Sequence, residues 1–267
     1  MIRGFWSGWD YNREDGLKTR FIGEGAREGW LKLGMRVREF AKMVDHTLLK
    51  PDATEKDIRR VCEEAAQHHF AAVCIPPCYV RGAARELRGT DVKVCTVVSF
   101  PFGHDTAAVK ILAVRDAISG GASEIDVVMN ISRFLSGEFS YVAEELSSVT
   151  QEVGAVAMNN GLNDAVVKVI IETAYLTDEM KRLAVQIVAS SGADFVKTST
   201  GFAPSGATPQ EVSLLRKEAP EGLAVKASGG IKTLDDAMEI VNAGASRLGM
   251  SASVAIMEEA ENGGLQE

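Results

Sequence analysis

The sequence predicts a single α/β domain folded as a closed (β/α)8 barrel, the TIM barrel, preceded by an N-terminal extension. From about residue 41 the chain alternates between eight short apolar runs and longer amphipathic segments. Three consecutive runs carry a central lysine, at intervals of 29 residues. Continuous apolar strands that alternate with helices are typical of a parallel sheet covered by helices. Eight repeats within about 220 residues fit a closed barrel, and the regular interval indicates copies of one strand and helix unit.

The apolar runs are the expected strands. In chain order they are 42–48, 71–75, 93–100, 124–129, 166–171, 194–199, 223–228 and 246–251. Helices are expected between them, including 54–69, 105–119, 177–190 and 208–217, because most of these segments begin with Thr or Asp followed by acidic residues. The alternative is an open doubly wound sheet. It is disfavoured because no GxGxxG motif follows the first run and polar residues end nearly all eight runs.

The rest of the chain sets the expected domain boundaries and partners. Residues 1–40 hold all three tryptophans and are interpreted as a partly helical extension, followed by the barrel at 41–260 and a tail at 261–267. The net charge of −8 argues against a nucleic-acid-binding surface. No run approaches the roughly 18 apolar residues that span a bilayer, and the four cysteines are too sparse for a disulfide framework. We therefore expect a cytoplasmic homo-oligomer, a dimer or a tetramer, without a membrane partner.

The lysine in the sixth run, Lys197 in FVKTSTGF, indicates chemistry because burying an ammonium group in an apolar strand is costly. Lys226 lies in the next run, and neighbouring strands are about 4.8 Å apart. Two ammonium groups about 4 Å apart repel by about 4 kcal/mol at an effective dielectric near 20. Repulsion and burial favour loss of a proton from one amine, which could then form a Schiff base with a carbonyl. Asp126 is the expected carboxylate for proton transfer, with a salt bridge to Lys168 or Lys226 as its alternative role.

Active sites of such barrels lie at the C-terminal ends of the strands. The further polar residues at these ends are Asp45, Thr47, Cys74, Ser99, Asn130, Glu172, Ser199, Ser228 and Ser251. The last three strands end in glycine-rich turns that resemble a phosphate site, at Thr200, Gly201, Ser228, Gly229, Gly230, Gly249 and Ser251. The four histidines form no HxH or HExxH pattern, and Cys74 and Cys78 lack a second pair, so no metal is expected.

These residues resemble the deoxyribose-phosphate aldolase family, class I metal-independent aldolases with a (β/α)8 barrel, over about residues 43–257. The resemblance is carried by VDHTLLKPDAT, AAVCIPPCYV, VKVCTVVSFPFG, GGASEIDVVMNI, VKVIIETAYLTDE, GADFVKTSTGF, VKASGGIKT and AGASRLGMS, in the family's order. It implies reversible cleavage of 2-deoxyribose 5-phosphate to acetaldehyde and glyceraldehyde 3-phosphate, with small-molecule aldehyde and sugar phosphate as partners and without a cofactor.

The resemblance also implies roles for individual residues. Lys197 would form the Schiff base, Lys226 would be the neighbour whose charge favours the neutral amine, and Asp126 with Lys168 would relay protons through water. Asp45 and Thr47 would position a hydroxyl of the acceptor. Phosphate would be bound by Gly201, Gly229, Gly230 and Ser251.

The chain departs from the family pattern at several points. Pro76 stands where many members have Asn or Tyr, and Phe202 replaces a lysine of some members. The segment after Gly249 reads MSAS in place of a paired Ser. The C-terminal sequence NGGLQE also lacks the tyrosine that some members use. A weaker phosphate grip is therefore expected. Two alternatives remain open: a Schiff-base lyase with a different aldehyde acceptor, and a non-catalytic sugar-phosphate-binding barrel.

Overall fold

The structure is a computed structural model that describes residues 35–162 and 164–265. Eight parallel strands form a closed barrel in sequence order, and β1 pairs with β8 to complete it. The strands are β1 (Val44–Thr47), β2 (Ala72–Ile75), β3 (Lys93–Val98), β4 (Glu124–Val128), β5 (Val166–Ile170), β6 (Phe195–Lys197), β7 (Ala224–Ser228) and β8 (Arg247–Met250). Each lies within a predicted apolar run, so the predicted barrel is confirmed.

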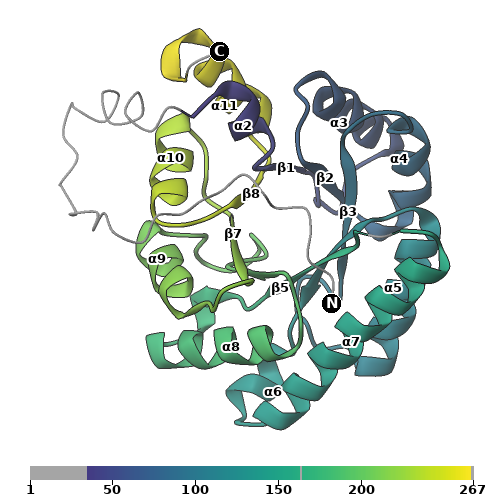
Figure 1. Ribbon diagram of the computed structural model, residues 1–267, viewed down its shortest axis with the longest axis vertical. Helices are drawn as coiled ribbons and strands as arrows, with labels where there is room; N and C mark the ends of the chain where they lie inside the picture. Colours follow the sequence, from purple (N-terminus) through teal and green to yellow (C-terminus); the bar gives the residue numbers. More distant parts are fainter. Residues whose placement is uncertain (1–34, 163, 266–267) are drawn as a thin grey trace.

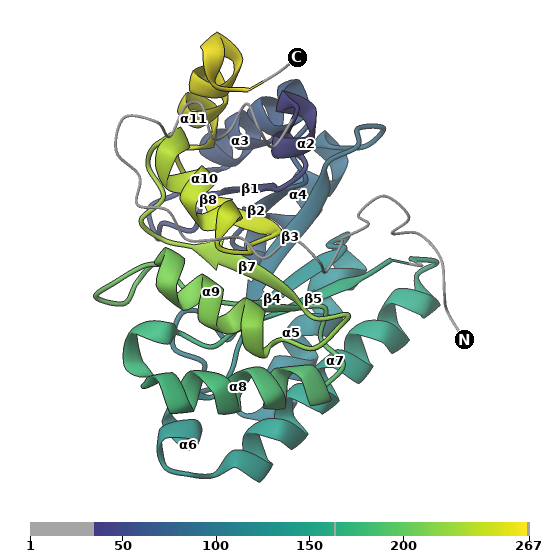
Figure 2. The same ribbon diagram turned by 60° about the vertical axis from the view of Figure 1, so that its left-hand side comes forward.

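Helices surround the strands on the outside of the barrel (Figures 1 and 2). They are α2 (Val37–Ala41), α3 (Glu55–Gln67), α4 (Val80–Glu86), α5 (Ala107–Gly120), α6 (Ile131–Leu135), α7 (Phe139–Asn159), α8 (Asp178–Ser190), α9 (Pro209–Glu218), α10 (Leu234–Asn242) and α11 (Ser253–Glu259). Short helical turns occur at Pro77–Tyr79, Thr173–Tyr175 and Ala260–Gly264. The four helices predicted individually correspond to α3, α5, α8 and α9.

Two helical elements lie across the expected boundaries of the extension and the tail. Helix α2 crosses the expected boundary at residue 40, and the turn at Ala260–Gly264 continues into the expected tail. The three tryptophans lie outside the described residues. In the described part of the chain, no helix combines the length and the apolar character needed to cross a bilayer.

Threonine caps start four of the outer helices. The hydroxyls of Thr54, Thr177, Thr208 and Thr233 each accept a hydrogen bond from the backbone N–H three residues later, at 3.1–3.3 Å. Such a cap satisfies one of the N–H groups that a helix start leaves without a partner. The predicted cap is therefore confirmed for α3, α8 and α9, whereas Thr106 before α5 forms no side-chain cap.

The barrel has an apolar outer core and a mixed interior. Between strands and helices, residues such as Val73, Ile125 and Val196 are fully buried. Inside the barrel a smaller apolar cluster of Ala72, Cys74, Cys95 and Val97 covers only part of the space. Much of the rest is taken by charged side chains on inward-facing strand positions.

Candidate active site

Seven charged residues are buried inside the barrel and form what we call the charge cluster. The exposed fraction is at most 8% for each of them: Asp45, Glu124, Asp126, Lys168, Lys197, Lys226 and Arg247. Strand register brings them together, because Lys197 pairs with Lys226 and Lys226 with Arg247 across β6, β7 and β8. Asp126 likewise pairs with Lys168 across β4 and β5. The predicted convergence of the three lysines with Asp126 is thus present.

Asp126 connects the three lysines. Its Oδ2 lies 2.6 Å from the Nζ of Lys197 and 2.6 Å from the Nζ of Lys226. Its Oδ1 lies 2.9 Å from the Nζ of Lys168. The salt bridge considered as an alternative role for Asp126 therefore forms with both candidate lysines, and Lys197 shares the same carboxylate.

In this cluster the neighbouring opposite charges outweigh the effect of burial on the pKa values. Burial raises the pKa of Asp126, but the cations of Lys168, Lys197 and Lys226 outweigh it and hold that pKa well below its usual range. Burial lowers the pKa of Lys226, yet Asp126 and Asp45 raise it above its ordinary value. The pKa of Lys168 is raised in the same way, against burial, chiefly by Asp126. Lys168 and Lys226 are therefore cationic, and Asp126 is ionised, at neutral pH.

Asp45 is a second carboxylate that forms ion pairs within the cluster, and it is not a free group at the mouth of the barrel. Its carboxylate contacts Lys226 and lies 2.7 Å from Nη1 of Arg247 and 3.6 Å from Nζ of Lys168. These charges hold the pKa of Asp45 well below its usual range, although burial acts in the opposite direction. Thr47, also predicted here, donates a hydrogen bond of 2.8 Å to the carbonyl of Asp45.

Glu124 and Arg247 belong to the charge cluster and were missed from the sequence. Arg247 Nη1 lies 3.1 Å from Glu124 Oε2, and the other contact of that oxygen is Lys168 Nζ at 2.6 Å. Both residues begin their strands, β4 and β8, whereas the predicted site residues stand late in the runs. A charged residue at an inward position of an apolar run was the available signal, as in EIDVV, where Glu124 stands two residues before Asp126.

Two thiols complete the interior. Cys74, a predicted site residue, has its Sγ 4.0 Å from Asp126 Oδ2, and Cys95, which was not predicted, has its Sγ 3.2 Å from Oδ1. Thiols and carboxylates this close could hold a metal ion. However, the Nζ of Lys168 lies among them, 3.3 Å from Cys95 Sγ and 2.9 Å from Asp126 Oδ1. The lysine ammonium already supplies the positive charge that these donors would otherwise bind.

The glycine-rich turns that are predicted to bind phosphate, which we call the glycine-rich corner, lie where the loop after β6 meets the end of β7. Gly201, Gly229 and Gly230 have φ angles of 87°, 82° and 85°, which side chains rarely adopt. A Cβ on Gly206, which was not predicted, would lie 2.2 Å from the carbonyl oxygen of Gly229. The N–H of Ala207 donates to the carbonyls of Ser228 and Gly229, at 3.1 Å each. The loop is therefore packed against β7 by backbone contacts.

Several predicted residues of this corner have other partners. The Ser228 hydroxyl donates to the carbonyl of Ser199 at 2.6 Å. A Cβ on Gly249 would lie 3.3 Å from Cε of Lys226, so this glycine makes room for that lysine. The exposed Ser251 and the glycine turns remain the predicted phosphate contacts.

Glu172 anchors the start of the same loop. Its buried carboxylate accepts hydrogen bonds from the Thr200 hydroxyl and from the Thr200 N–H, the latter at 3.2 Å. Burial raises the pKa of Glu172, and the Thr200 hydrogen bonds oppose that shift. Its φ of 53° is unusual for a residue with a side chain. Strain of this kind is frequent at functional sites.

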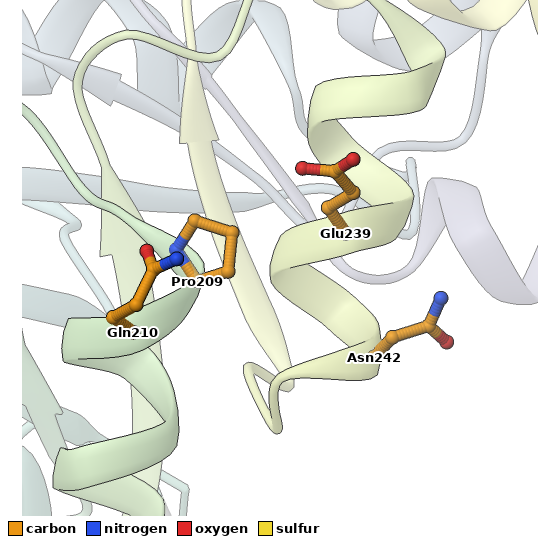
Figure 3. A pocket seen from close by; sticks show the side chains of 4 residues that line it. All are labelled: Pro209, Gln210, Glu239 and Asn242. Carbon is orange, nitrogen blue, oxygen red and sulfur yellow. The ribbon is translucent and has the colours of Figure 1, made fainter. Parts of the chain in front are cut away.

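A separate surface pocket lies between α9 and α10 and is lined by Pro209, Gln210, Glu239 and Asn242 (Figure 3). Its lining includes none of the cluster residues, and it offers a single carboxylate and two amides. The candidate active site is therefore the barrel interior and its mouth, not this pocket.

Comparison with known proteins identifies a family. The profile of the DeoC/LacD family aldolases matches residues 40–257. A deoxyribose-phosphate aldolase of Caldanaerobacter subterraneus subsp. tengcongensis is 51% identical over 235 residues, covering 88% of this chain and 99% of that protein. A deoxyribose-phosphate aldolase of a Thermoanaerobacter species is 50% identical over 219 residues, covering 82% and 96%.

Solved structures agree with these sequence matches. The structure described as QR15, an aldolase, superposes with a TM-score of 0.77 at 39% identity, covering 84% of this chain and 96% of that one. The tetrameric deoxyribose phosphate aldolase of Aeropyrum pernix gives a TM-score of 0.79 at 33% identity, covering 90% and 98%.

Proposed function

The chain belongs to the DeoC/LacD family of aldolases, and we infer that it is a deoxyribose-phosphate aldolase. It reversibly cleaves 2-deoxyribose 5-phosphate to acetaldehyde and glyceraldehyde 3-phosphate. The observation that carries the mechanism is the position of the Lys197 amine. It lies inside the barrel, 2.6 Å from a carboxylate oxygen that also binds the ammonium of Lys226.

In the proposed reaction the neutral Lys197 amine attacks the C1 aldehyde of the open-chain sugar. Loss of water gives a protonated Schiff base, which is an electron sink. The 3-hydroxyl then loses its proton, the C2–C3 bond breaks, and its electron pair moves toward the nitrogen to form an enamine. Glyceraldehyde 3-phosphate leaves. Protonation of the enamine carbon and hydrolysis release acetaldehyde and restore the amine.

Asp126 and Lys168 are proposed to move the protons of these steps, with bound water as the carrier. The support is geometric, because Asp126 is hydrogen-bonded to Lys197 through one oxygen and to Lys168 through the other. The low pKa of Asp126 means that the carboxylate returns a proton readily and rests ionised between steps. Lys168 and Lys226, whose pKa values are raised, stay protonated and donate hydrogen bonds to this carboxylate, which holds it in place.

The decisive experiment measures cleavage of deoxyribose 5-phosphate together with trapping by borohydride. With acetaldehyde and borohydride, a two-carbon adduct is expected on Lys197 by peptide mass spectrometry. Lys197→Ala should reduce cleavage by roughly 10³-fold or more, as removal of a covalent nucleophile does in other enzymes. Lys56→Ala, a change of an exposed lysine on α3, is the control and should leave both readouts unchanged. Full cleavage by Lys197→Ala would overturn the mechanism.

A different aldehyde acceptor is the second candidate, and Phe202 favours it. This side chain follows Gly201, is 53% exposed and contacts Phe100 edge to face with ring centroids 5.4 Å apart. It places apolar surface where some family members have a cation. Comparing turnover of phosphorylated and unphosphorylated acceptors separates this candidate from the first. Ligand-induced stabilisation without turnover would instead support a binding protein.

Assembly, location and domain limits are proposals of the same kind. Self-association is proposed from the Aeropyrum pernix relative, which is described as a tetramer, and sedimentation of the full chain tests it. A cytoplasmic location is proposed because the four cysteines are free thiols. We retain residues 1–40, 41–260 and 261–267 as proposed units.

A further inference from the structure

The charges of the cluster balance without Lys197. Three carboxylates, Asp45, Glu124 and Asp126, meet three cations, Lys168, Lys226 and Arg247. Each of the three carboxylates lies within 4.0 Å of at least two of those cations, and each cation lies within 4.0 Å of at least two of the carboxylates. Lys197 is a fourth cation when protonated, and Asp126 is the one carboxylate that it contacts among the described residues.

Arg247 is the member of this set whose charge is permanent. A guanidinium does not lose its proton in proteins, and contacts with Asp45 and Glu124 raise the pKa of Arg247 further despite burial. Its strand position aligns it with Lys226, which in turn aligns with Lys197. The backbones of Arg247 and Lys197 are therefore two strands apart, at about 10 Å, which we take as the scale of the separation of their charges. Glu124 neutralises part of this charge through its contact at 3.1 Å.

The other titratable groups near Lys197 and its partner Asp126 belong to β2, β3 and the segment that follows β5. They are the thiols of Cys74 and Cys95 and the carboxyl of Glu172. Both sulfur atoms lie against Asp126, whereas Glu172 is hydrogen-bonded to Thr200. None of these three is an ion-pair partner of Lys197 in the described chain. They are unchanged in all the variants below, so they do not account for a difference between those variants.

We propose that Arg247 and Glu124, at the end of the barrel opposite its mouth, set the protonation of Lys197 through the charge balance of the cluster. Both are positioning residues, because they act through the cluster and not by contact with the reacting carbonyl. With Arg247 included, the six groups other than Lys197 carry equal numbers of positive and negative charges, so the proton of Lys197 is in excess. This inference rests on the proposed Schiff-base function and adds to it two residues whose charges act in opposite directions on how readily the amine loses its proton.

The inference predicts opposite shifts from two neutralising substitutions. Glu124→Gln removes a negative charge, so the Lys197 amine becomes neutral at lower pH. Arg247→Gln removes a positive charge, so the amine keeps its proton to higher pH. One unit charge at about 10 Å in an effective dielectric near 20 shifts a titration by roughly one pH unit. A purely structural role would weaken activity in both variants without moving the profiles in opposite directions.

The experiment measures the pH dependence of adduct formation at Lys197 with acetaldehyde and cyanoborohydride, followed by intact-mass spectrometry. Wild type measured alongside corrects for the reagent's own pH dependence. The half-maximal pH should fall by roughly one unit in Glu124→Gln and rise by roughly one unit in Arg247→Gln. The double variant restores the balance and should titrate near wild type. Arg247→Lys keeps the charge and should do the same.

The outcomes separate this inference from the function on which it rests. If wild type forms no adduct at Lys197, the Schiff-base function fails. If wild type forms the adduct but the two variants shift in the same direction, or neither shifts, the role of Arg247 and Glu124 is wrong. If Arg247→Gln does not fold, Glu124→Gln and Arg247→Lys decide the question: a lower pH for the first and an unchanged pH for the second support the inference, and any other pair overturns it.

Discussion

At Gly206 the loop after β6 passes so close to the end of β7 that a side chain has no space. A Cβ there would lie 2.2 Å from the carbonyl oxygen of Gly229 and 2.9 Å from its Cα. Backbone atoms cannot move aside as the end of a flexible side chain can. The contact therefore fixes the shape of the glycine-rich corner, where a Cβ on Gly229 would also be in contact with Cα of Gly201, at 3.5 Å.

Gly206→Ala should therefore weaken binding of the phosphate end of the substrate. The loop must move away from β7, and loss of one hydrogen bond to a charged group, about 1.5 kcal/mol, raises KM roughly tenfold. Steady-state kinetics with deoxyribose 5-phosphate and with unphosphorylated deoxyribose provide the measurement, because only the first should show the rise. Equal effects on both substrates, or none, would contradict a phosphate role for this corner.

At the residue scale, sequence predicts the residues whose position depends on one strand. Lys168, Lys197, Lys226 and Asp126 stand out because each is a charge within an apolar run. Glu124, Arg247 and Gly206 depend on contacts between segments distant in the chain. The inward position of Glu124 can be recognised within its own strand, but which partner a charge at a strand start reaches is decided by the stagger of the closed barrel.

At the scale of elements, a buried ion pair connects two helices to the strand that carries Asp126. Lys110 of α5 lies 2.7 Å from Glu145 of α7 and donates to the carbonyl of Val128 at 2.8 Å. Glu145 also accepts from the N–H of Asn130 at 3.2 Å. These contacts fix the end of β4. Sequence patterns predict helices such as α5, but not that its lysine is paired with a carboxylate 35 residues away.

Helix α7 offers a test of local stability at a distance from the charge cluster. Gly154 lies on the exposed side of this 21-residue helix, and a Cβ there would meet no atom within 4 Å. Gly154→Ala should stabilise the protein by about 0.5–1 kcal/mol, because alanine loses less backbone freedom on folding. Thermal unfolding should show an increase in Tm of about 2 °C for a chain of this size. A lower Tm would indicate a contact that the structure does not show.

At the scale of the whole molecule, the barrel separates two kinds of burial. Its outer core is apolar, so the alternation of apolar runs and helices predicts it well. Its interior contains the charge cluster, and strand order and register determine where most of the charged residues of this cluster lie. Once eight parallel strands close in sequence order, the three lysines spaced by 29 residues must lie on adjacent strands. Closure of the barrel thus brings residues that are regularly spaced in the sequence together in one site.

The stability of the whole fold should depend on pH through His46, which lies outside the charge cluster. His46 is 4% exposed, with its Nε2 2.7 Å from Glu64 Oε2 and its ring tilted against Phe70 at 5.4 Å. Burial lowers the pKa of His46, outweighing the opposite effect of Glu64. The unfolded chain therefore binds this proton more readily. The stabilising contribution is present above the unfolded pKa of about 6.5 and is lost as pH falls toward the folded value.

Urea unfolding at several pH values between 7.5 and 5.5 tests this dependence. The free energy of unfolding of wild type should decline more steeply with falling pH than that of His46→Gln. Carboxyls that titrate in this window do so in both proteins, so the difference between the slopes reports His46. The pKa values of Asp45 and Asp126 are low, so the stability that these two carboxylates contribute is lost only below about pH 4. His104→Gln, which changes an exposed histidine, should keep the wild-type slope. Equal slopes for wild type and His46→Gln would show that the buried imidazole does not control stability in this range.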